Sequence, residues 1–118
     1  MISMREAYEK IGANYDDAYA RLMGEEMLAR FALKFLDDES MDKLEAAMAA
    51  GDAEGAFMAA HTLKGVSQNL GFDNLYEPAV VVTEALRGAD AVDGAREGMH
   101  ALQQQYAATM SALRETAE

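Results

Sequence analysis

The residue best suited to chemistry in this chain is His61, which precedes the run Thr62-Leu63-Lys64-Gly65. Residues three and four positions apart share one face of a helix, so Lys64 and Gly65 would both lie beside the His61 ring. An ammonium group beside an imidazole suits a phosphoryl group, because it can donate hydrogen bonds to the oxygens and offset their charge. A glycine leaves bare backbone, which gives another protein room to reach the ring. Together the three residues predict a histidine that carries a phosphoryl group.

Gly65 supports this prediction because its position is otherwise costly. Glycine in a helix interior costs about 1 kcal/mol of stability relative to alanine, and no turn is needed here. Close helix packing is the other explanation, but a projection at about 100° per residue puts Gly65 on the outer face. Phe57, Met58 and Gln68 share that face and predict a partner-docking patch. Phe57 or Met58 could instead tuck under a neighbouring helix.

A predicted helix over residues 53–70 positions His61. Gly51 and Gly71 bound it, and Asp52 suits the N-cap because its carboxylate can accept a hydrogen bond from the first turn. The projection that turns His61 outward gathers small and aliphatic side chains on the opposite face, which we expect to be buried. These side chains are Ala56, Ala59, Ala60, Leu63, Val66, Ser67 and Leu70.

The other segments are predicted to be helical too. The chain has nine methionines and one proline, and alanine, leucine, methionine, glutamate and lysine all favour helices. Pro78 lies too deep in a predicted helix over residues 74–87 to be a first-turn proline, so we expect a bend or a delayed start there, with Asp73 as the cap. The last helix should begin at Asp90. The remaining predicted segments are residues 4–11, 16–23, 25–37 and 40–50.

The expected fold class is all-α. Apolar residues recur every three or four positions along the last helix, which is the pattern of a seam between packed helices. Long helices joined by short turns predict an antiparallel up-down-up-down four-helix bundle over residues 25–118, preceded by a short helical extension over residues 1–24. The seam residues are Val92, Ala95, Met99, Leu102, Tyr106 and Leu113.

Composition narrows the classes of partner. A length of 118 residues suits one domain, and a net charge of -11 would repel DNA, RNA and anionic lipid headgroups. No apolar run reaches the length of a membrane span, and the first residues do not lead into a signal-peptide core. The absence of cysteine removes thiolate metal sites and suits a reducing, cytoplasmic location. We therefore expect the partner to be another soluble protein or a small molecule, with no nucleic acid, membrane or bound metal.

The stretch from Ala60 to Leu75 resembles the signature of histidine-containing phosphotransfer (HPt) domains. In that pattern a histidine is followed by Leu-Lys-Gly, a Leu-Gly pair near the helix end and a further leucine. The matching positions are His61, Leu63, Lys64, Gly65, Leu70, Gly71 and Leu75. The resemblance implies a phosphorelay intermediate in two-component signalling. His61 would accept a phosphoryl group from a receiver-domain aspartate and pass it to another, with Lys64 as the charge partner and Gly65 as the clearance residue.

The same resemblance implies what the chain does not supply. The partners would be receiver domains of response regulators or hybrid histidine kinases, and Mg²⁺ would belong to the receiver. The chain would have no cofactor or nucleotide site of its own, would not be an enzyme, and would act as a monomer. In this family a polar side chain often steadies the second ring nitrogen, and Gln68 and Glu77 are the candidates here. The chain would be either a free-standing carrier or a domain excised from a longer protein.

Two alternatives compete with phosphotransfer. The first is an acidic helical docking module that uses the face around Phe57 and Met58 and accepts no phosphate. The second is a hydrolase with His61 as general base, which lacks a nearby nucleophile or acid in the sequence. The other histidine, His100, lies one position off the apolar seam and is expected on a solvated face.

Overall fold

The computed structural model describes residues 1–116, and this part of the chain is all-helical, as predicted. Residues 117 and 118, the end of the predicted 25–118 domain, lie outside the described residues. The elements in order are α1 (Met4–Ile11), α2 (Tyr15–Leu22), α3 (Glu25–Lys34), the 3-10 turn η1 (Phe35–Asp37), α4 (Ser40–Ala50), α5 (Ala53–Asn69), α6 (Asp73–Leu86), the 3-10 turn η2 (Asp93–Ala95) and α7 (Arg96–Thr116).

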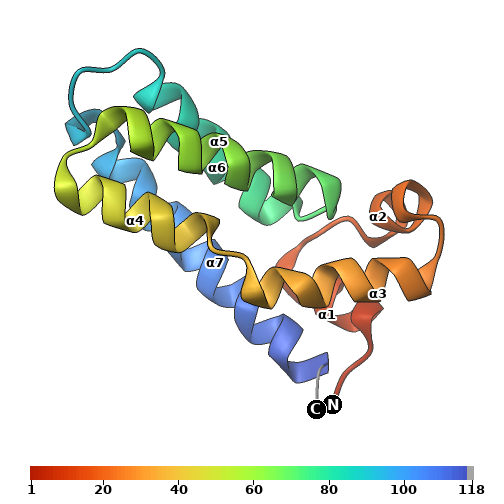
Figure 1. Ribbon diagram of the computed structural model, residues 1–118. Coiled ribbons are helices and arrows are strands. Elements are labelled where there is room, and N and C mark those ends of the chain that lie inside the picture. Colours follow the sequence, from red (N-terminus) through yellow and green to blue (C-terminus); the bar gives the residue numbers. More distant parts are fainter. Residues whose placement is uncertain (117–118) are drawn as a thin grey trace.

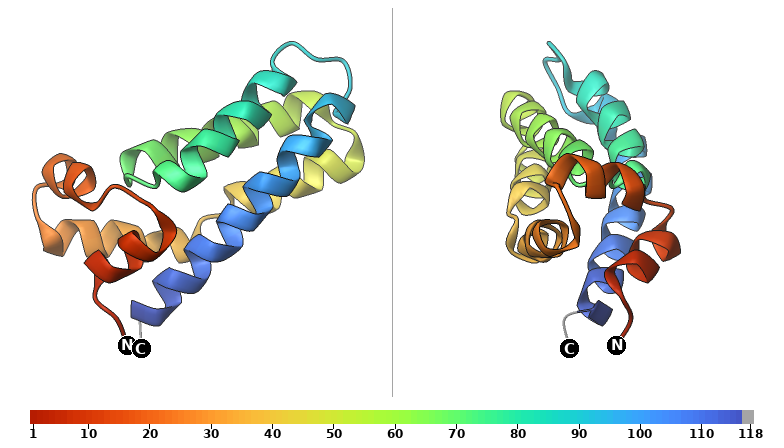
Figure 2. Two further views of the ribbon diagram at one scale, coloured as in Figure 1. Left: turned by 180° about the vertical axis from the view of Figure 1, so that it is seen from behind. Right: turned by 90° about the vertical axis from the view of Figure 1, so that its right-hand side faces the viewer.

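Helices α4 to α7 pack on one another in chain order. The α4 helix packs on α5, α5 on α6 and α6 on α7, and successive helices turn back on each other (Figure 1). The turn between α4 and α5 is short because Gly51 adopts the left-handed conformation (φ 71°), in which a glycine meets no steric penalty. Helices α1 to α3 lie together at the end of the molecule where α5 ends and α6 begins (Figure 2).

The first 24 residues pack on the rest of the molecule. The α1 helix lies against α7, and the Ile2 amide donates to the carbonyl of Glu115 at 3.2 Å. Tyr8 is fully buried, and its hydroxyl donates to the carbonyl oxygen of Leu70 at 2.7 Å. Its ring lies 5.3 Å from that of Phe72, so α1 seals the end of α5. The division of the chain at residue 24 stays a prediction.

The start of α6 corrects two expectations. Phe72, not Asp73, occupies the N-cap, and the helix already begins at Asp73, so the expected delayed start at Pro78 is wrong. The alternative, a bend at Pro78, stays a prediction. The Phe72 ring is fully buried, and its carbonyl accepts from the amides of Leu75 and Tyr76, so packing of this ring starts the helix. Pro78 is therefore the sixth helical residue, and the helix tolerates the loss of one backbone donor there.

The last helix begins six residues later than predicted, at Arg96 instead of Asp90. Gly88 adopts a left-handed conformation (φ 64°) after α6, and residues 89–92 form a loop before η2. Val92 is nevertheless buried, so an apolar residue assigned to the helical seam anchors a loop instead. Glycine disfavours helix, and Gly94 lies within η2. Near residue 35, the predicted 25–37 helix likewise divides into α3 and η1.

Candidate functional site

The helix that carries His61, α5, is held by a cap and by a buried stripe of small side chains. The Asp52 carboxylate accepts a hydrogen bond from the Gly55 amide at 2.9 Å, as expected for the N-cap. Val66 differs from the prediction, since it is only half-buried and lines a groove. The other predicted members of the buried face are buried: Ala56, Ala59, Ala60, Leu63, Ser67 and Leu70.

His61 stands on the exposed face of α5, with Lys64 and Gly65 beside it. His61 and Gly65 are exposed, and Lys64 is half-buried. A methyl group added at Gly65 would meet no atom within 4 Å outside its own stretch of helix, so packing against other elements does not explain this glycine. Within residues 1–116, His61 makes no side-chain hydrogen bond, so neither Gln68 nor Glu77 holds its ring in this state.

A charged cluster, formed by Lys64, Glu84 and Arg87, lies near His61 on the side of α6. The Phe57 ring is half-buried and lies 5.9 Å from the His61 ring, at an angle of 42° between the planes. The Arg87 guanidinium carbon lies 5.1 Å from the centre of the Phe57 ring, a distance that suits a cation–π contact. Arg87 also donates from Nη2 to Glu84 Oε2 at 2.8 Å and from Nε at 3.2 Å.

Lys64 belongs to the same charged cluster. The pKa of the Glu84 carboxyl is lowered chiefly because Arg87 donates hydrogen bonds to it, and the positive charges of Arg87 and Lys64 lower it further. Lys64 forms no ion pair within 4.0 Å among the described residues, so its ammonium group is free to bind another anion. Glu84 and Arg87 could not be predicted from the sequence, because only the packing of α5 on α6 brings them to the helix that carries His61.

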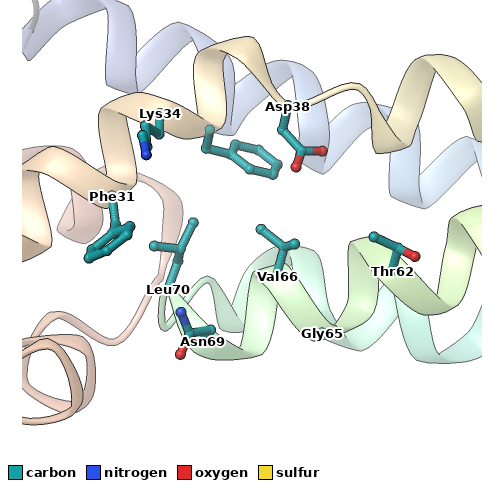
Figure 3. A pocket seen from close by; sticks show the side chains of 9 residues that line it. Phe31, Lys34, Asp38, Thr62, Gly65, Val66, Asn69 and Leu70 are labelled. Atoms are coloured by element: carbon teal, nitrogen blue, oxygen red, sulfur yellow. The ribbon is translucent and has the colours of Figure 1, made fainter.

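The opposite side of His61 opens into an apolar groove between α3–η1 and α5, with a volume of about 490 Å³ (Figure 3). Thr62 and Gly65 contribute to its α5 wall, so the groove reaches the position next to His61. The Lys34 ammonium lies 5.8 Å from the centre of the Phe31 ring at the rim. The full lining is Phe31, Lys34, Phe35, Asp38, Thr62, Gly65, Val66, Asn69 and Leu70.

The predicted docking residues do not line this groove. Met58 is exposed by 60%, Gln68 is exposed, and Phe57 is half-buried against the core. The groove could not be predicted from the sequence, because α3 and η1 supply one of its walls. Val66 was the one residue that could have indicated the groove from the sequence. It is apolar and lies at the edge of the predicted buried stripe, where neighbouring helices cover a side chain incompletely.

The α2 helix supplies a cation at the C-terminal end of α5. The Arg21 guanidinium donates to the carbonyl oxygen of Gln68 and, at 3.4 Å, to that of Asn69. It also pairs with Asp17 at 2.9 Å. A cation at these carbonyls complements the negative end of the helix dipole. Arg21 borders Gly65 and Gln68, so the N-terminal segment reaches the face that carries His61.

The second histidine has a different setting. His100 is exposed on α7 beside a cavity of about 260 Å³ that Glu45 and Arg96 also line. Arg96 is paired with Asp93 at 3.0 Å, and Gln103 donates to Glu45 at 3.1 Å. The neighbouring polar groups are therefore bound to each other, and a carboxylate lies close by. The residues three and four positions after His100 are Gln103 and Gln104, so it lacks the lysine and the open glycine that flank His61.

Within residues 1–116, no three histidine, aspartate or glutamate side chains come together in a group that could hold a metal ion. In the same part of the chain, no helix combines the length and the apolar character that crossing a membrane requires.

An exposed imidazole with a free ammonium group and open space beside it can act as a nucleophile toward a phosphoryl group delivered by another protein. A family model described as "Hpt domain" matches residues 26–116. No curated protein sequence and no solved structure shows a match to the chain. The matched range contains the residues around His61, the groove and the charged cluster, and it leaves out α1 and α2.

Proposed function

The chain belongs to the Hpt domain family, and on this premise we propose that it is a histidine phosphocarrier that moves a phosphoryl group between receiver domains. Family membership supports histidine phosphotransfer and receiver domains as partners. His61 is the proposed phosphoacceptor, because it is exposed on α5 with the free ammonium of Lys64 and the open space at Gly65 beside it. That observation carries the proposal.

The proposed reaction needs two transfers. A ring nitrogen of neutral His61 attacks the phosphorus of an aspartyl phosphate on the donor receiver. The N–P bond forms while the bond from phosphorus to the aspartate oxygen breaks, and its electron pair returns to the carboxylate. In the second transfer an aspartate of another receiver attacks, and the N–P electron pair returns to the imidazole. Lys64 offsets the charge of the phosphoryl group, and Mg²⁺ is assigned to the receiver.

The proposed docking face spans the exposed surface around His61. The groove provides apolar area next to Gly65, where a receiver element could exclude water. Met58 extends this face toward the N-terminal end of α5, and methionine adapts to more than one partner. Phe57 and Gln68 complete the proposed contacts. Two successive receivers would use the same face, since both must reach one nitrogen.

The proposal also includes the architecture and setting of the carrier. We propose that α4 to α7 form an antiparallel four-helix bundle, supported by the packing of α4 on α5, α5 on α6 and α6 on α7. The carrier would be monomeric and cytoplasmic, would use no cofactor of its own, and would not act as an enzyme in the usual sense. It would bind the receivers as a soluble protein.

The groove also favours a second candidate function, a docking module that binds a partner without accepting phosphate. An apolar groove of about 490 Å³ serves binding whether or not His61 reacts. The two functions differ in covalent chemistry, so one assay separates them.

The test follows label transfer from a ³²P-labelled receiver to wild type, His61→Gln and His100→Gln. We expect an acid-labile, base-stable phosphate on wild type and on His100→Gln, and none on His61→Gln. Binding of an unphosphorylated receiver should be similar for all three proteins. Binding without label on wild type would favour the docking module. Label retained by His61→Gln would contradict His61 as the acceptor.

A further inference from the structure

A second cation, Arg87, contacts the Phe57 ring that borders His61. Arg87 follows the last residue of α6 and has an extended backbone conformation (φ -63°, ψ 116°). Its guanidinium lies over the Phe57 ring at 5.1 Å, and Phe57 in turn lies 5.9 Å from His61. The guanidinium and the imidazole therefore border the same aromatic ring.

The ion pair of Arg87 with Glu84 is exposed to water and therefore weak. Glu84 binds the guanidinium at 2.8 Å, but the side chains are 54% and 55% exposed. Exposed ion pairs contribute little to stability, because water solvates both groups well when they separate. A phosphoryl group carries a charge of about −1.5 to −2 near neutral pH and offers three acceptor oxygens. Such a group on His61 would compete strongly with a single carboxylate for the guanidinium, which forms bidentate contacts with phosphate.

We propose that Arg87 is a second phosphate-binding residue, which Glu84 holds until His61 is phosphorylated. This inference rests on the proposed function. In the phosphorylated state Arg87 leaves Glu84 and donates hydrogen bonds to the phosphoryl oxygens on the neighbouring His61. Glu84 then lies unpaired near the new negative charge, with Lys64 as the remaining cation close to it. No covalent bond changes in this step, and the N–P bond stays intact.

The exchange of partners has a consequence for the relay. Arg87 stabilises the phosphorylated form of His61, while Glu84 opposes it, both by competing for cations and by repelling the phosphoryl group. The balance keeps the phosphohistidine from becoming too stable to pass its phosphoryl group onward. Glu84 and Arg87 therefore set the equilibrium of phosphoryl exchange between His61 and a receiver aspartate.

The chain contains a matched control pair. Asp93 and Arg96 have the same spacing of three residues, a nitrogen–oxygen distance of 3.0 Å and exposed side chains. Arg96 lies beside His100 instead of His61. Any general effect of removing an exposed ion pair should appear equally in both pairs.

The experiment measures the equilibrium ratio of phospho-His61 to phosphoreceiver with one purified receiver. Arg87→Gln should lower this ratio about fivefold, Glu84→Gln should raise it about threefold, and both effects should shrink as salt is raised toward about 1 M. Arg87→Lys should recover part of the loss because it keeps the positive charge. Asp93→Asn and Arg96→Gln should leave the ratio at the wild-type value.

A second readout follows Arg87 directly. The Nε–H resonance of Arg87, identified by its loss in Arg87→Gln, should shift in NMR spectra when His61 is phosphorylated, whereas that of Arg96 should not. Exchange ratios for the Arg87 and Glu84 variants equal to those of the control pair, or an unmoved Arg87 resonance, would overturn this inference alone. Failure of wild-type His61 to accept any phosphate would overturn it together with the proposed function.

Discussion

The two sides of α5 differ in chemistry although they flank the same histidine. Toward α3 and η1, Thr62 and Gly65 border an apolar groove. Toward α6, Phe57 contacts Arg87, which pairs with Glu84, and the charge of Lys64 helps to lower the pKa of the Glu84 carboxyl. The two sides are close together, because Gly65 and Phe57 lie only about 80° apart around the axis of α5 at about 100° per residue.

The two sides of α5 are therefore expected to have different roles, one in binding the receiver and one in stabilising the phosphoryl group. An apolar groove favours binding by excluding water, whereas exposed cations favour an anion without adding much to protein–protein affinity. Changes on the groove side should therefore alter access and affinity for the receiver. Changes on the ionic side should alter the stability of the phosphoryl group on His61. Variants that affect both properties alike would break the comparison.

The largest effect is expected from Gly65→Gln. A long side chain at this open position would displace the incoming receiver from the His61 nitrogen, and a displacement of about 1 Å can cost a reaction about 100-fold. We expect the rate of phosphoryl transfer to fall about 100-fold at saturating receiver, measured by rapid-quench label transfer. Gly94→Gln is the control, since Gly94 also has open space but lies in η2. Equal rates for wild type and Gly65→Gln would refute the access argument.

Thr62→Tyr should have a smaller effect, confined to binding. The ring would occupy the end of the groove nearest His61, and the dissociation constant of the receiver should rise about tenfold, or about 1.4 kcal/mol. The half-life of isolated phospho-His61 should not change. Calorimetric titration measures the first quantity and loss of label the second. Gln104→Tyr on the exposed face of α7 controls for a surface tyrosine. A normal affinity for Thr62→Tyr would place docking elsewhere.

Lys64→Ala tests the ionic side. Loss of one charge-assisted hydrogen bond at a solvated site is worth about 1 kcal/mol, so transfer to His61 should slow about fivefold while receiver affinity stays within about twofold. Lys64→Arg should recover most of the rate. Lys43→Ala, which removes an exposed lysine from α4, should behave as wild type. A loss of affinity without a loss of rate would assign Lys64 to docking.

The smallest effect is expected from Gly65→Ala. A methyl group meets no atom within 4 Å at this helical position, so the free energy of unfolding should rise by about 0.5–1 kcal/mol, while transfer stays within about twofold of wild type. Urea denaturation measures the first value. Gly55→Ala should do the opposite, because its methyl group would clash with the capping carboxylate of Asp52. A Gly65→Ala protein less stable than wild type would indicate a packing role for this glycine.

Local geometry explains what could be predicted from the sequence. The exposure of His61 and the positions of Lys64 and Gly65 depend only on the period of one helix, and the structure places all three on its outer face. The all-α class follows from composition and periodicity in the same way. The roles of these residues stay predictions, because geometry alone does not measure phosphotransfer.

Tertiary packing explains what could not be predicted. Arg87 reaches the site from α6, and Arg21 from α2, over distances in sequence that no spacing rule connects to His61. Val66 is apolar and was expected in the core, but α3 leaves a groove over it. At the start of α6, the burial of Phe72 outweighs the capping preference of Asp73. In each case a contact between distant segments decides the outcome.

A pulse–chase experiment tests the central claim most directly. The protein is labelled by one phosphorylated receiver, separated from it, and mixed with a second, unlabelled receiver. We predict that the label lies on His61 before the chase, as mapped on peptides at neutral pH, and moves to the aspartate of the second receiver during it. Label found on another residue, or label on His61 that no receiver can remove, would contradict the account.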